Sequence, residues 1–471
     1  MLLERRAPAR IPLISVISGL SHALDLTEGH PPGHANRSCI IGMRIAQAIG
    51  LPVDQQINLH HALLLKDAGC SSNAQRVHEL FGGDDHEVKR AAWLRDWRRF
   101  ADQVSHALQY TERRGSLFAR MRKLIVLAAK GPRGGGELFR IRCDRGAQIA
   151  LAMGFPRQTA EAIRSMDEHW DGGGYPDGLR THAIPLESRI INLAQVAEIF
   201  FETGGSALAL ETVARRSGRW FDPELARVFT RIATPPGFWY ALRSENLIPA
   251  VTSLQPPPSS VAADPGMLER IALAFAWVID AKSPYTYEHS EGVSAIAGRI
   301  GERLGLSIEQ TARLRQMALL HDIGKLAVPN RILDKRGPLT GEELALVRTH
   351  PRHTRDILSR VPIFDELADE AASHHERMDG RGYHRGLLAG KFSAGARALA
   401  VADVTEALGS DRPYRKGMSP DAVAQVLREA SGTALCPQAV DAALDVLSAP
   451  APRPTSSRSL FRLAESSFLH G

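Results

Sequence analysis

The chain has 471 residues, 44% of them hydrophobic and 23% charged, with a net charge of +6 at pH 7. This length is too great for one ordinary core and predicts two or three domains, while the composition excludes a disordered or fibrous chain. The positive charges are scattered, so they give only weak support for a nucleic-acid partner. The four cysteines show no C-x-x-C spacing, which argues against a zinc ribbon or a disulfide framework and fits a reducing cytoplasm.

The N-terminus imitates a secretory signal, because basic residues precede a short apolar run. Glu4 lies within the basic region, however, and the apolar segment 13–26 has a counterpart in the second half of the chain. No segment approaches the ~20 apolar residues that a membrane-spanning helix needs. We therefore expect a cytoplasmic protein with no membrane partner.

The order of features on one side of the proline run Pro256–Pro258 is repeated on the other. At an offset of 255 residues, His34 matches His289 and segment 61–70 matches segment 316–325; at an offset of 208, segment 171–176 matches segment 379–384. The change of offset places an insertion in the first copy between Cys70 and Arg142. Fixed offsets of this kind indicate a duplicated domain.

Both copies show apolar residues at helical spacing and lack alternating strand patterns, which predicts an all-α tandem duplication of one helical domain. We expect a first copy over residues 1–250, with its insertion near 71–141, and a second copy over 264–448. Consecutive prolines favour an extended linker at 251–263. Residues 449–471 are rich in Ser, Pro and Arg and are predicted to be flexible. No helix-turn-helix pattern follows, so a DNA partner is not expected.

Histidines and carboxylates cluster in the second copy. The candidate metal ligands are His289, His321, Asp322, His350, His374, His375 and Asp403. Five imidazoles and two carboxylates are too many for one tetrahedral ion and suit two octahedral ions bridged by a carboxylate, with iron or manganese favoured by the lack of thiolates. Such a centre binds hydroxide and a phosphate, which Lys325 could also reach. A lone histidine is more often an ordinary residue, as we expect for His353.

The motifs Leu320–Lys325, His374–Tyr383 and Ser410–Arg415 resemble those of the HD-GYP family within the HD phosphohydrolase superfamily, over about residues 264–448. The resemblance implies a helical domain that holds divalent metals, often iron, and hydrolyses cyclic di-GMP to the linear dinucleotide or to GMP. It implies one metal at His289, His321, Asp322 and Asp403, and another at Asp322, His350, His374 and His375. It implies catalytic roles for Asp322 and Lys325 and substrate contacts for Lys325, Gly382, Tyr383, Arg412 and Arg415.

The sequence departs from the family pattern at a few positions. His384 replaces the proline of the G-Y-P motif, and Glu406 replaces an aspartate that often follows Asp403. Tyr285 stands where a three-metal variant of the family has a glutamate, so we expect two metals. For Arg412 and Arg415, a surface ion pair is the alternative to a phosphate contact.

The first copy keeps only two of the seven ligand positions, His34 and Asp67. The other positions hold Lys66, Arg142, Met166, Asp167 and Gln195. We expect no metal in this copy. It retains the loop Gly174–Pro176, which is either a turn that the fold requires or a docking loop, and its insertion is the segment that we expect to be regulatory.

The leading hypothesis is a cyclic di-GMP phosphodiesterase that uses two divalent ions, iron or manganese. One alternative is an HD phosphohydrolase that acts on another cyclic or linear nucleotide. The other is a non-catalytic signalling module that binds partners through both copies. A signalling protein partner and a homodimer are both left open.

Overall fold

The computed structural model describes residues 12–96, 99–113, 116–257, 264–286, 288–335, 337–411 and 415–449. These residues form helices joined by turns and a few isolated bridges, without a strand, so the predicted all-α class is confirmed. None of the described helices combines the length and the apolar character required to cross a membrane. Part of the linker and the predicted flexible tail beyond Ala449 lie outside the described residues.

Several helices of the first copy have counterparts at the expected offsets in the second, which supports the tandem duplication. The framework of the first copy is α1 Leu13–Glu28, α2 His34–Ala48, α3 Val53–Leu65, α8 Arg157–Arg164, α9 Leu186–Arg216, α10 Pro223–Ala233, α11 Gly237–Tyr240 and α12 Ile248–Ser253. The second copy comprises α13 Pro265–Asp280, α14 His289–Arg303, α15 Ile308–Leu320, η4 Ile323–Ala327, α16 Asn330–Leu333, α17 Gly341–Val347, α18 His350–Leu358, α19 Asp365–Ala371, α20 Ala394–Gly409, α21 Pro420–Ala430 and α22 Pro437–Ser448.

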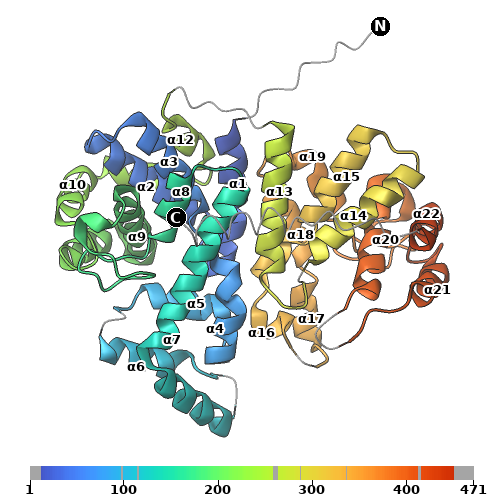
Figure 1. Cartoon of the computed structure of the whole chain (residues 1–471), viewed down its shortest axis with the longest axis horizontal. Helices are drawn as coiled ribbons and strands as arrows, with labels where there is room; N and C mark the ends of the chain where they lie inside the picture. Colours follow the sequence, from blue (N-terminus) through green and yellow to red (C-terminus); the bar gives the residue numbers. More distant parts are fainter. Residues whose placement is uncertain are drawn as a thin grey trace.

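The inserted region is itself helical and extends the first copy on one side (Figure 1). It contains η1 Cys70–Asn73, α4 Ala74–Phe81, α5 Asp85–Trp93, α6 Phe100–Tyr110 and most of α7 Leu117–Ala152. The last part of α7 carries Arg142 and corresponds to α18 of the second copy, which begins at His350.

The first helix of each copy lies at the junction between the copies, as the central position of α1 and α13 in Figure 1 shows. Helix α1 packs on η4 and α18 of the second copy, and α13 packs on η1 and α7 of the first. The approach is close, because a Cβ built on Gly19 would lie 2.8 Å from the Arg360 carbonyl oxygen. The first copy is therefore packed directly against the segment that follows Asp322.

Gly324 allows η4 to touch α18. The sequence suggests that this glycine stops a helix, but α15 already ends at Leu320 and Gly324 lies inside η4. A Cβ on Gly324 would lie 2.0 Å from the His350 carbonyl oxygen, and Gly69 meets the Arg142 carbonyl in the same way in the first copy. Close backbone approach is thus the reason for glycine at both positions.

Replacing Gly324 by alanine should force η4 away from α18. We expect the free energy of unfolding to fall by about 1 to 3 kcal/mol, the usual effect of overpacking a filled interior, as measured by urea denaturation. Gly341→Ala is the matched control, because a Cβ there meets nothing within 4 Å. Equal stability of the two variants would contradict this account of Gly324.

Candidate metal centre

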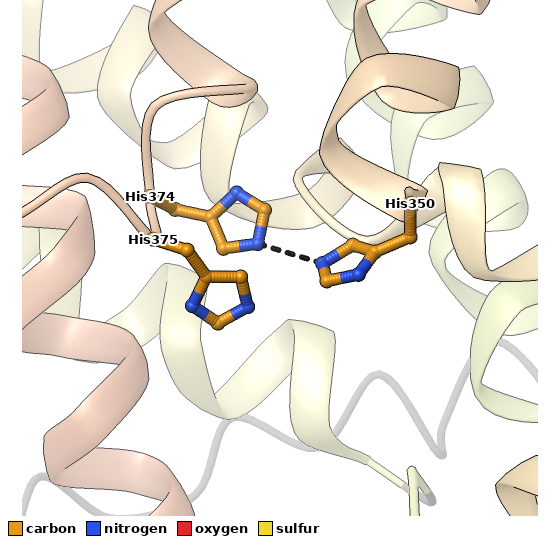
Figure 2. Close-up of side chains that lie close together, drawn as sticks. All are labelled: His350, His374 and His375. Atoms are coloured by element: carbon orange, nitrogen blue, oxygen red, sulfur yellow. Dashed lines mark hydrogen bonds between the residues drawn. The ribbon is translucent and has the colours of Figure 1, made fainter. Parts of the chain in front are cut away.

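The seven predicted metal ligands come from the ends and faces of five helices and converge on one buried region. His289 begins α14, His321 and Asp322 follow α15, His350 begins α18, His374 and His375 follow α19, and Asp403 lies within α20. Two sets of ligand atoms each fall within 4.8 Å of one another: His289, His321 and Asp322, and His350, His374 and His375. Figure 2 shows the rings of the second set turned toward one another.

Asp322 stands between the two sets. Its Oδ2 lies 3.6 Å from His289 Nε2 and 3.4 Å from His321 Nε2. Its Oδ1 faces the other way and lies 3.3 Å from His350 Nε2 and 3.7 Å from His374 Nε2. One carboxylate therefore offers an oxygen to each group, as a bridging ligand does.

Asp403 joins the first set of ligands. Its Oδ1 lies 3.3 Å from His289 Nε2 and 3.9 Å from His321 Nε2. The structure thus brings together all seven residues that the sequence predicts, in the grouping that the family resemblance implies.

Backbone carbonyls select the tautomer of three of the histidines. The Nδ1 atoms of His321, His350 and His374 lie 2.7, 2.7 and 2.6 Å from the carbonyl oxygens of the residues three positions earlier. A carbonyl can only accept, so each Nδ1 carries the proton and each Nε2 presents a lone pair. Ordering of this kind is typical of metal-binding histidines.

The unpaired atoms of the centre fit a cation. His350 Nε2 and His374 Nε2 face each other at 3.1 Å (Figure 2). His321 Nε2 and Asp322 Oδ1 are buried and make no hydrogen bond within the described part of the chain. Divalent metal ions beside Asp322 would satisfy these atoms, which are nitrogen and oxygen donors.

The charges of the centre also suit metal ligation. Burial lowers the pKa of His375 to about 3 and, with neighbouring imidazoles, holds the pKa of His374 well below its usual value. Although burial opposes it, the charges of Lys325 and His321 keep the pKa of Asp322 well below its usual range. The site therefore presents neutral imidazoles at His374 and His375 and an ionised carboxylate at Asp322.

Glu406 is a site residue that the sequence interpretation missed. Its carboxylate accepts a hydrogen bond from His289 Nδ1 and so orients Nε2 toward Asp322 and Asp403. Burial opposes protonation of His289, but hydrogen bonds to Asp403 and Glu406 raise its pKa to about 10 in the metal-free chain. In the first copy Glu198 accepts a hydrogen bond from His34 in the same way. The matching glutamates of the two copies could therefore have indicated the role of Glu406.

The G-Y-P loop shapes the surroundings of His375. The ring of Tyr383 stacks on His375 with centroids 4.7 Å apart, and the Arg348 guanidinium lies 5.2 Å from the Tyr383 ring centre. A Cβ on Gly382 would lie 2.6 Å from the His375 carbonyl oxygen. The Tyr383–His384 peptide is cis, like the Tyr175–Pro176 peptide of the first copy.

Glu376 fixes this loop and was also missed. Its carboxylate accepts from the backbone N–H groups of Arg385 and Leu387, each at 2.8 Å. Glu168 accepts from Asp177 and Gly178 at the same place in the first copy. Both copies thus use a glutamate to bind the backbone of this loop, which supports a structural role for the loop.

The remaining predicted substrate contacts differ in position. Lys325 donates to Asp322 Oδ2, and 21% of its side chain is exposed, so this residue lies between the centre and the solvent. Arg415 donates to the carbonyl oxygens of Ala407 and Leu408 at the end of α20. Arg412 lies outside the described residues.

In the first copy, side-chain cations stand at the places of the metal ligands. Lys66 replaces the histidine of the H-D pair, and its Nζ donates to His34 Nε2 at 2.8 Å and to Asp67 Oδ2. Arg142, at the position of His350, pairs with Asp167 and lies 3.6 Å from Glu28. Buried carboxylates that would attract a metal are thus already paired, which supports the prediction that this copy binds none.

Comparison with known proteins matches this chain to the HD domain family over residues 137–225 and 274–438. The chain is 39% identical over 427 residues to the 3'3'-cGAMP-specific phosphodiesterase 3 of Vibrio cholerae, which covers 91% of this chain and 93% of that protein. It is 38% identical over 179 residues to the cyclic di-GMP phosphodiesterase response regulator RpfG of Xanthomonas campestris, covering 38% of this chain and 46% of that protein.

A solved structure is similar over the same extent. The crystal structure of the cyclic GMP-AMP specific phosphodiesterase V-cGAP3 of V. cholerae superposes with a TM-score of 0.65 at 35% identity. The match covers 93% of this chain and 99% of that one. The likeness therefore includes both copies and the insertion as a unit.

Glu406→Gln keeps the size of the side chain but removes the charge that orients His289. We expect metal affinity to fall about 10- to 100-fold, the usual effect of losing such a partner, as measured by competition with a chelator. Glu198→Gln is the matched change in the first copy and should leave metal affinity at the wild-type value. Equal affinity of the Glu406 variant and the wild type would contradict this role.

Proposed function

Because this chain belongs to the HD domain family and is a metal-dependent phosphohydrolase, we propose that its second copy hydrolyses a 3'3' cyclic dinucleotide at a dinuclear centre, with 3'3'-cGAMP preferred over cyclic di-GMP. The observation that carries the proposal is the position of Asp322 between two sets of histidines. A phosphodiester is the substrate class that such a pair of ions serves best.

Each residue of the centre has a defined task in this proposal. His289, His321, Asp322 and Asp403 would hold one ion, and Asp322, His350, His374 and His375 the other. Two bound divalent ions supply a nucleophilic hydroxide at neutral pH and neutralise the charge of a phosphate. Glu406 keeps His289 in the tautomer that ligation needs, and Tyr383 holds the plane of His375.

Lys325 would act on the phosphate. Its ammonium lies beside Asp322, and the residue lies between the centre and the solvent, where a phosphate oxygen can reach it. Hydrolysis adds water across one P–O3' bond: the phosphorus gains an oxygen, and the departing O3' gains a proton. An ammonium that donates to this oxygen lowers the barrier to its departure, and the product is a linear dinucleotide with a 5'-phosphate.

The preference for 3'3'-cGAMP rests on the extent of the similarity. The V. cholerae protein named for this substrate matches across 91% of the chain, both copies included, whereas RpfG matches 38% of it. Cyclic di-GMP stays the second candidate, because the H-D and G-Y motifs of the second copy resemble those of enzymes that cleave it. A signalling partner and a homodimer stay predictions.

Asp322→Asn should abolish turnover. An amide cannot bridge two cations as a carboxylate does, so we expect kcat for the metal-loaded chain to fall by more than about 1,000-fold and the bound metal per chain to fall as well. Asp379→Asn is a control on an exposed carboxylate that pairs with Arg377 and should retain activity. Retained turnover in the Asp322 variant would exclude the dinuclear mechanism.

The two substrates should be separable by rate. With iron or manganese bound, we expect kcat/KM for 3'3'-cGAMP to exceed that for cyclic di-GMP by about tenfold or more, equivalent to about 1.4 kcal/mol of transition-state binding. Release of the linear dinucleotide, followed by chromatography, measures both. An equal or reversed ratio would replace the first candidate by the second.

A further inference from the structure

The inserted helix α5 (Asp85–Trp93) reaches from the first copy into the second. Its first residue, Asp85, is fully buried, and both carboxylate oxygens bind residues of the other copy. Oδ1 accepts the backbone N–H of Asn330 at 2.8 Å, and Oδ2 lies 3.3 Å from Lys282 Nζ. A segment absent from the second copy thus contributes a buried charge to it.

Lys282 and Asn330 belong to the two connections that flank the metal ligands. Lys282 lies between the end of α13 and His289, and Asn330 begins α16 directly after the η4 segment that carries Lys325. The Asn330 side-chain amide donates to the Lys282 carbonyl at 2.5 Å and to Asp334 Oδ2 at 2.8 Å. Asp85 therefore ties together two connections, one that leads to His289 and one that follows Lys325.

The network continues toward His289. Ser283, next to Lys282, donates its hydroxyl to Asp334 Oδ1 at 2.6 Å. Lys282 Nζ also lies 2.8 Å from His86 Nε2, so its ammonium is enclosed by α5. With Lys282 only 1% exposed, water cannot replace these partners.

Helix α5 also binds the first copy, at one position that has a match among its contacts in the second. Lys89, one turn after Asp85, donates to the carbonyl oxygens of Thr27 at 3.4 Å and Cys70 at 2.7 Å. In the repeat, Thr27 matches Lys282 and Cys70 matches Lys325. Asn330 lies five residues after Lys325, so one of the two places is shared: α5 binds Lys282 of the second copy through a carboxylate and the matching Thr27 of the first copy through an ammonium.

We infer that Asp85 is a positioning residue for the reaction of the second copy, acting through Lys282 and Asn330 on the segments that present His289 and Lys325. The kinetic part of this inference rests on the proposed function. The ordinary alternative is that the buried pair only adds to stability. A buried ion pair can be replaced by neutral side chains without loss of stability, whereas removing one partner leaves a costly unpaired charge. A double variant without either charge therefore distinguishes a positioning role of Asp85 from a purely stabilising one.

The test uses the full-length chain with Asp85→Asn, Lys282→Met and the double variant. For each we would measure the thermal transition, the metal retained against a chelator, and kcat and KM for 3'3'-cGAMP. Asp84→Asn is the matched control: Asn still caps α5, the charge that faces Arg331 is removed, and the contacts of Asp85 with Lys282 and Asn330 are kept.

We expect Asp85→Asn to lower kcat and metal retention by about tenfold, with KM little changed. The double variant should regain thermal stability, because no charge is left unpaired, yet keep the low kcat and the low metal retention. It should be no slower than the single variants, since Asp85 acts through Lys282. The Asp84 variant should match the wild type in all three measurements.

The inference would be overturned if the double variant regained kcat and metal retention along with its stability. The pair of Asp85 and Lys282 would then serve stability alone. If Asp85→Asn alone does not fold, the double variant still decides, because it contains no unpaired charge. If the wild type cleaves no 3'3'-cGAMP, the proposed function fails, while metal retention in the variants continues to test the positioning role separately.

Discussion

The second copy depends on one buried carboxylate, Asp322, that has histidines on two sides and the ammonium of Lys325 beside it. Asp322 is almost completely shielded from water, where an unpaired negative charge would be strongly unfavourable. The chain meets this constraint by bringing histidines from separate helices around it and by placing Lys325 one turn further on. Gly324 has no side chain because the backbone that carries Asp322 must lie against α18. The local fold and the metal chemistry are therefore two consequences of the same charge.

Much of this centre could be predicted from the sequence, because some ligands come in adjacent pairs and because the first copy has other residues at five of the seven positions. The all-α class followed from helical periodicity, and the duplication from constant offsets. The roles of Glu406 and Glu376 were not predicted. Each role depends on which helix or loop lies opposite the side chain and not on a local motif. Both have counterparts in the first copy, so a comparison of the copies beyond the metal ligands would have indicated them.

Other features could not be predicted from local patterns. Arg415 matches a phosphate-binding position of the family, yet its guanidinium serves the carbonyl oxygens that end α20. The contact of Asp85 with Lys282 joins residues nearly 200 positions apart through an insertion that has no second version in the chain for comparison. Such contacts depend on how the two copies pack against each other, and this packing cannot be read from a single sequence.

Lys66 gives the first copy an internal cation at the position where the second copy has a candidate metal ligand. Its ammonium, buried between His34 and Asp67, is part of the polypeptide and is present as soon as the segment has been synthesised. The second copy must acquire its cations from the cell. The charge pairing inside the first copy is therefore independent of the metal supply, whereas that of the second copy changes with it.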